Sequence, residues 1–129
     1  MTIEIPEEHL EQYEEARRIV QAHISSTDAL AQLAEEASEL AQAALKLRRC
    51  FVGTNPTPVK PKDAIAHVRE EVADVVVCLD VLAPTLPPLD ERPVATEKMT
   101  RWAQRLTEAR PDWEPIKSVV LDMGGRHES

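Results

Sequence analysis

The chain has 129 residues, about the length of one domain, and it is poor in aromatic side chains. Aromatic residues make up 3% and hydrophobic residues 43% of it, so the apolar positions are mostly Ala, Leu and Val, which favours helices packed on one another. The formal net charge of −8 leaves no dominant basic surface and argues against a nucleic-acid polymer as partner.

Two helices are predicted in the first half of the chain. Pro6 followed by two glutamates is typical of a helix start, and apolar residues then recur every three or four positions, so a first helix is expected from about Pro6 to Ala22. Residues Ser25–Asp28 form a capping cluster, after which a long apolar stripe predicts a second helix that ends near Arg49. The basic last turn of this helix suits a helix C-terminus.

The second half of the chain predicts two further helices. A loop with three prolines, Phe51–Lys62, leads into a third helix from about Lys62 to Ala83, whose later turns are apolar nearly all round and therefore indicate burial on several sides. Four prolines, the last of them Pro93, are expected to break the chain before a fourth helix from about Thr96 to Ala109. The apolar residues of this helix are expected to face inward: Met99, Trp102, Ala103 and Leu106. Residues 111–129 are predicted to be an irregular extension of a domain spanning residues 1–110, with Ile116–Met123 able to dock on it.

The expected location is the cytoplasm. Cys50 and Cys78 are too few for a disulfide framework and are expected to be reduced thiols. The segment Met1–His9 is acidic and lacks an apolar signal core. The longest apolar run, Val75–Leu79, is too short to span a bilayer, so no membrane partner is expected.

An acidic pattern recurs on the second and third helices. It consists of Glu35, Glu36 and Glu39 on the second and Glu70, Glu71 and Asp74 on the third. Residues three apart on a helix are neighbours, roughly 5–6 Å apart at Cβ. At 100° per residue, the middle member of each trio lies on the shoulder of the apolar stripe, the last member somewhat farther round, and the first points toward water. Two antiparallel helices with this shared phase can bring four carboxylates together: Glu36, Glu39, Glu71 and Asp74.

Four carboxylates in a small volume call for a cation. Solvated helix faces explain Glu35 and Glu70, but they explain Asp74 poorly, because apolar residues share its side of the helix and an unpaired buried carboxylate is costly. The chain has no Glu-x-x-His pair and no zinc-like histidine spacing, and His67, one turn before Glu71, is expected to be structural or to support a ligand. An all-oxygen set suits Mg²⁺, with Mn²⁺ as a possible substitute, and Mg²⁺ usually completes its shell with substrate phosphates.

Basic residues are available to hold such phosphates. Lys98, Arg101 and Arg105 recur along the fourth helix, and Lys46 lies two turns after Glu39 on nearly the same face. By periodicity alone the stripe on the fourth helix reads as a solvated face. Together with the acids it predicts a phosphate clamp.

The paired motifs Glu35-Glu36-Ala37-Ser38-Glu39 and Glu70-Glu71-Val72-Ala73-Asp74 resemble the signature of MazG-like nucleoside triphosphate pyrophosphohydrolases, in the all-α NTP pyrophosphatase superfamily. The segment from Glu97 to Arg105 resembles the basic helix that follows in many members. The resemblance implies an all-α bundle of four to five helices completed by oligomerisation, as a homodimer or homotetramer.

The same resemblance implies an activity and its residues. Glu36, Glu39, Glu71 and Asp74 would bind Mg²⁺, with Glu36 or Glu39 orienting or deprotonating the attacking water. Lys46, Lys98, Arg101 and Arg105 would bind the nucleoside triphosphate, which is hydrolysed to a monophosphate and pyrophosphate. Two alternatives stay open: a catalytically inactive helical module that binds a nucleotide or a protein, and hydrolysis of a biosynthetic phosphoribosyl nucleotide.

Overall fold

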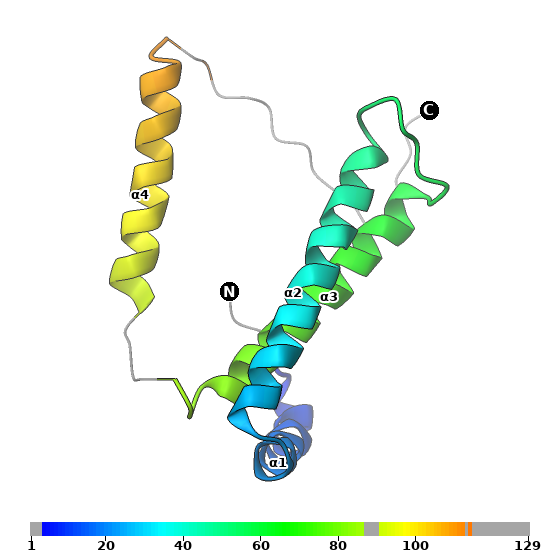
Figure 1. The fold of residues 1–129 in the computed structure, drawn as a ribbon, viewed down its shortest axis with the longest axis vertical. Coiled ribbons are helices and arrows are strands. Elements are labelled where there is room, and N and C mark those ends of the chain that lie inside the picture. Colours follow the sequence, from blue (N-terminus) through cyan, green and yellow to red (C-terminus); the bar gives the residue numbers. More distant parts are fainter. Residues whose placement is uncertain (1–3, 87–90, 113, 115–129) are drawn as a thin grey trace. The chain divides into compact units, whose positions relative to one another are not determined.

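A computed structural model describes residues 4–86, 91–112 and 114. Every regular element in these ranges is an α-helix, which confirms the predicted all-α class. The helices, labelled in Figure 1, are α1 (Glu7–His23), α2 (Ser26–Arg49), α3 (Pro61–Leu82) and α4 (Glu91–Ala109). The described chain forms two compact units, one with α1 to α3 and the other with α4.

An antiparallel hairpin of α2 and α3 forms the core of the first unit (Figure 1). Small residues let the two helices approach closely, since Ala43 on α2 and Ala64 on α3 are each only 1% exposed. The rest of the core comes mainly from α3, where Ile65, Val76, Cys78 and Leu82 are buried. The hairpin therefore holds the flanks of α2 and α3 at fixed positions.

Local signals explain the ends of the first three helices, which lie close to the predicted ones. The Ser25 hydroxyl accepts a hydrogen bond from the backbone N–H of Asp28 at 3.1 Å and so caps α2. Pro61 occupies the first position of α3, where its missing N–H costs nothing. Acidic Glu7 and Glu8 lie in the first turn of α1, as suits the positive end of a helix dipole.

Although α1 contributes no buried residue, polar contacts hold it against α3. The Tyr13 hydroxyl donates a hydrogen bond to Asp80 Oδ2. Farther along α1, the Gln21 amide nitrogen lies 3.4 Å and 3.3 Å from the carbonyl oxygens of Asp80 and Val81. The same part of α3 is less buried than predicted: Val77 is 41% and Leu79 45% exposed, since α2 covers one side of α3 and α1 covers little more.

The fourth helix differs from its prediction in two respects. It starts at Glu91 rather than near Thr96, because Pro93 lies in the first turn, where backbone N–H groups have no acceptor within the helix and proline is tolerated. The residues predicted to face inward are exposed: Met99 by 65%, Trp102 by 56% and Leu106 by 54%, with Ala103 exposed as well. No other helix belongs to the described part of this unit, so no described helix of the unit covers them.

The described helices include none that is both long and apolar enough to cross a membrane. The predicted docking of Ile116–Met123 lies outside the described residues.

Candidate metal centre

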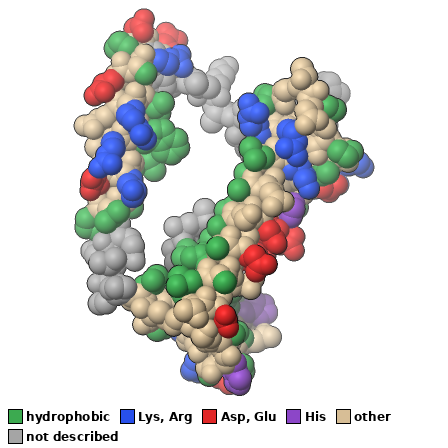
Figure 2. Space-filling view, in the orientation of Figure 1, with side chains coloured by type: hydrophobic (Ala, Val, Ile, Leu, Met, Phe, Trp, Pro, Cys, Tyr) green, Lys and Arg blue, Asp and Glu red, His purple; other side chains and the backbone are tan. Residues whose placement is uncertain are grey.

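Three of the four predicted metal ligands meet at the flank of the α2–α3 hairpin. Carboxylate oxygens of Glu36, Glu71 and Asp74, one from each residue, all lie within 4.8 Å of one another. Ligands on opposite sides of one Mg²⁺ are about 4.2 Å apart, given Mg–O distances of roughly 2.1 Å, so small side-chain adjustments would place all three on a single ion. Acidic side chains gather on this flank in the space-filling view of Figure 2.

Glu39, the fourth predicted ligand, is exposed and lies next to this cluster. The negative charge of Glu36, followed by that of Glu71, raises the pKa of Glu39 above its ordinary value. A cation bound among these carboxylates would offset the repulsion that raises the pKa of Glu39. The outer members of the two trios, Glu35 and Glu70, are exposed, as predicted. The expected burial of Asp74 is wrong: Asp74 is exposed, and Glu71 is the buried carboxylate of α3.

The Glu71 carboxylate has one satisfied oxygen and one that lacks a partner. The residue is only 6% exposed, and its Oε1 lies 2.9 Å from Nε2 of His67, one turn earlier on α3. Its Oε2 is fully buried and has no hydrogen-bond partner among the described residues. An unsatisfied buried carboxylate oxygen is costly. The position of the Glu71 carboxylate among two others therefore fits a bound cation, and this donor set fits Mg²⁺.

Glu36 is held in the same manner on the other helix. The amide nitrogen of Gln32, one turn earlier on α2, donates a hydrogen bond of 2.7 Å to Glu36 Oε1. The spacing along the chain from Gln32 to His67 equals that from Glu36 to Glu71, so the two helices carry equivalent pairs. Sequence reasoning missed Gln32, although this equal spacing was a signal that could have identified it.

The predicted cationic residues are not gathered at the acids by any described contact. Lys46 is half-buried on α2, two turns beyond Glu39. The other three, Lys98, Arg101 and Arg105, are exposed on α4, where basic side chains form a stripe in Figure 2. Arg101 pairs there with Glu97, one turn earlier. These four residues therefore remain predicted phosphate ligands.

Both cysteines are free thiols with no catalytic arrangement around them among the described residues. Burial, and then the charges of Glu36 and Asp74, raise the pKa of the Cys78 thiol, which keeps it protonated and unreactive. Cys50 is half-buried at the end of α2, with its sulfur 3.6 Å from the carbonyl oxygen of Val59.

Comparison of the chain with protein-family models, with curated proteins and with solved structures finds no match in any of the three. The case for a function therefore rests on the geometry and chemistry of this acidic site.

Proposed function

We propose that the protein is a Mg²⁺-dependent nucleoside triphosphate pyrophosphohydrolase. The observation that supports this most strongly is the buried Glu71 carboxylate, which has one unpartnered oxygen and lies among the carboxylates of Glu36 and Asp74. Carboxylates from two helices in this arrangement are the ligand type that Mg²⁺ takes in enzymes acting on phosphates. The resemblance of the two acidic motifs to MazG-like enzymes points to the same chemistry.

The proposed reaction breaks one phosphoanhydride bond. Water attacks the α-phosphorus of the triphosphate, pyrophosphate leaves, and a nucleoside monophosphate carrying the new P–O bond remains. When bound, Mg²⁺ would neutralise phosphate charge and acidify a nearby water. Lys46, Lys98, Arg101 and Arg105 would neutralise further phosphate oxygens.

Glu36, Glu39, Glu71 and Asp74 would hold the metal, and Glu36 or Glu39 would take the proton of the attacking water. Glu39 has the stronger case as the base. It is exposed to solvent beside the other three carboxylates, where a water molecule can reach it. Glu36 already has one oxygen committed to the Gln32 amide, which suits a fixed ligand better than a mobile base. Gln32 and His67 keep two ligand carboxylates in place before substrate arrives.

A substrate panel with matched variants tests the proposal. The full chain would be incubated with Mg²⁺ and canonical or modified nucleoside triphosphates, and with a phosphoribosyl nucleotide, while released pyrophosphate is measured. Asp74→Asn should abolish turnover, whereas Glu70→Gln, the same kind of charge change on an exposed neighbour, should leave it intact. Turnover of every nucleotide no faster than by Asp74→Asn contradicts the proposal and favours an inactive nucleotide- or protein-binding module.

We further propose that the enzyme is a cytoplasmic homodimer or homotetramer. The exposed apolar side chains of Met99, Trp102 and Leu106 on α4 offer a surface that a second copy would bury. The two free cysteines suit a reducing compartment.

A further inference from the structure

The loop end of the α2–α3 hairpin carries positive charge and no negative charge. Residues 48–62, the hairpin tip, contain four of the chain's 15 basic residues and none of its 23 acidic ones. The four are Arg48 and Arg49 in the last turn of α2 and Lys60 and Lys62 at the start of α3. Figure 2 shows basic side chains gathered at this end of the hairpin. The tip is therefore opposite in sign to a chain whose net charge is −8.

Contacts within the loop bring the two basic pairs together. The sulfur of Cys50 lies 3.6 Å from the carbonyl oxygen of Val59 and so joins the two arms of the loop. The basic pairs flank this contact in the sequence, one directly before Cys50 and the other beginning directly after Val59. The backbone N–H groups of Phe51 and Val52 donate to the carbonyl oxygen of Arg48 at 3.0 Å and 3.1 Å, which folds the start of the loop back onto α2.

The four cations are not neutralised by acidic partners in the part of the chain that the structure describes. None of them forms an ion pair there, and all except the half-buried Arg49 are exposed. The nearest acid in the sequence is Asp63, in the first turn of α3. Glu39 precedes Arg48 by nine residues, or about 14 Å along the helix axis, which exceeds the Debye length of about 8 Å. The acidic cluster is therefore largely screened from a surface that touches the tip.

Two large apolar side chains are exposed beside these cations. Phe51 is 52% and Val52 49% exposed. An anionic lipid bilayer matches both features of the tip, because its headgroups attract Lys and Arg while the boundary between headgroups and acyl chains takes up apolar side chains. A nucleic-acid strand also attracts cations, but Val52 cannot stack on a base, and Phe51 is the only aromatic side chain at the tip.

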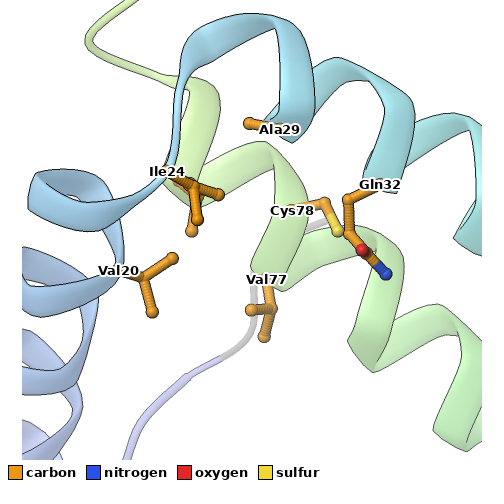
Figure 3. Close-up of a pocket in the computed structure, with 7 residues that line it drawn as sticks. Val20, Ile24, Ala29, Gln32, Val77 and Cys78 are labelled. Atoms are coloured by element: carbon orange, nitrogen blue, oxygen red, sulfur yellow. The ribbon is translucent and has the colours of Figure 1, made fainter.

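Charge distinguishes the tip from another exposed apolar surface of the same unit. A hollow of about 110 Å³ lies between α1, α2 and α3 toward the opposite end of the hairpin, and Val20, Ile24 and Val77 are among the residues that line it (Figure 3). None of its described lining residues is Lys or Arg. The hollow thus offers apolar area without the positive charge that anionic lipid attracts, and it supplies a control position.

We propose that the hairpin tip binds the surface of an anionic lipid bilayer, with its four cations against the headgroups and with Phe51 and Val52 inserted between them. Binding of this kind needs no spanning helix, and the described helices include none. It is independent of the hydrolase activity proposed above, because the tip contains none of the residues assigned to the metal or the triphosphate.

The test is sedimentation of the full chain with vesicles of phosphatidylcholine, either alone or with about one third phosphatidylserine. EDTA is present throughout, so that no divalent cation can bridge the acidic cluster to lipid phosphate. The protein should bind the phosphatidylserine vesicles at least about tenfold more tightly than the neutral ones, and rising salt should weaken this binding.

Variants assign the binding to the tip. Arg48→Gln combined with Lys60→Gln should weaken it by about 25-fold, since each cation at an anionic surface contributes about fivefold, and Asp63→Asn should strengthen it severalfold. Phe51→Ser should weaken it by about tenfold or more. The matched controls are Arg18→Gln, at an exposed position on α1, and Val20→Ser, in the hollow and 39% exposed; both should leave it unchanged.

Three results would overturn the proposal. The first is equal binding to the two kinds of vesicle, or binding to neither. The second is binding to phosphatidylserine vesicles that the tip variants weaken no more than the controls do. The third is binding of a single-stranded oligonucleotide through the tip without binding to vesicles, which would assign this surface to a nucleic acid. None of them bears on the proposed hydrolase, which is tested by pyrophosphate release.

Discussion

Neutralising Glu71 should stabilise the metal-free protein, which is the opposite of what a buried residue change usually does. Glu71→Gln keeps the shape of the side chain and the acceptor for His67. It also removes a buried negative charge within 4.8 Å of those on Glu36 and Asp74 and provides an amide N–H that can donate to them. The carboxylates then repel one another less.

The size of the effect follows from these separations. Two unit charges 4.8 Å apart repel by about 0.9 kcal/mol in water and by about 3.5 kcal/mol at an effective dielectric constant of 20. The repulsion between Glu71 and Asp74 lies near the lower value, because Asp74 is exposed. The repulsion between Glu71 and Glu36 lies between the two values, because Glu36 is half-buried. Since water screens the exposed members of the cluster, Glu71→Gln should raise the free energy of unfolding by about 1–3 kcal/mol, or the melting temperature by roughly 3–10 °C.

The assay is thermal unfolding followed by circular dichroism, first with EDTA and then with increasing Mg²⁺. Wild type should gain about 2.7 kcal/mol at a Mg²⁺ concentration 100 times its Kd, and Glu71→Gln should gain almost nothing, so the order of stability shifts toward wild type as Mg²⁺ is added. Glu70→Gln should change stability by less than about 0.5 kcal/mol and keep the response to Mg²⁺. A Glu71→Gln protein that is less stable in EDTA and still responds fully to Mg²⁺ would refute the electrostatic reasoning.

Three other predictions concern single side chains of the two units. Gln32→Met and His67→Phe should each weaken Mn²⁺ binding, measured by calorimetry, by about 10- to 100-fold, because each removes a contact that positions a ligand carboxylate. His67→Gln should retain most of the affinity. Unchanged affinities would show that the two contacts do not position the ligands. Burial, and then the hydrogen bond to Asp80, raises the pKa of Tyr13 to about 12. Because Tyr13 is the only tyrosine in the sequence, ultraviolet titration reports on it alone. The midpoint should lie near pH 12 in the folded protein and near pH 10 in urea. Because the folded state holds this proton more tightly, its contribution to stability is complete below pH 10 and is lost as the pH rises toward about 12, and Asp80→Asn should lower the folded midpoint. Trp102→Glu should reduce the mass found by sedimentation to that of a single chain if α4 forms the contact between copies, whereas an unchanged oligomer would place that contact elsewhere.

The parts of the fold that were predictable are those determined by local sequence. Capping by Ser25 and the apolar periodicity of α2 and α3 depend on residues within a few turns of one another, so those helices follow from the sequence. The start of α4 was missed because proline breaks a helix interior but is accepted in a first turn, and pattern alone does not distinguish the two cases. The spacing of Met99 and Trp102 identifies an apolar face of α4, but it does not identify what covers that face. Their exposure could therefore not be predicted from the sequence.

The acidic site was predictable for a similar reason. Equal phase on two adjacent helices is a property of the sequence, and it led correctly to the convergence of Glu36, Glu71 and Asp74. The equal spacing of Gln32 and His67 identifies Gln32 as a candidate, but its contact with Glu36 depends on a side-chain conformation that the sequence does not specify. The basic residues of α4 belong to an element in another unit, and helical phase says nothing about their distance from the acids.

Direct titration of the full chain with Mn²⁺, monitored by the electron paramagnetic resonance signal of the free ion, tests whether the acidic cluster binds a divalent cation. A metal site formed by Glu36, Glu71 and Asp74 should give saturable binding that Mg²⁺ displaces, that Asp74→Asn abolishes and that Glu70→Gln preserves. Failure of wild type to remove any Mn²⁺ from solution, or equal binding by wild type and Asp74→Asn, would contradict it.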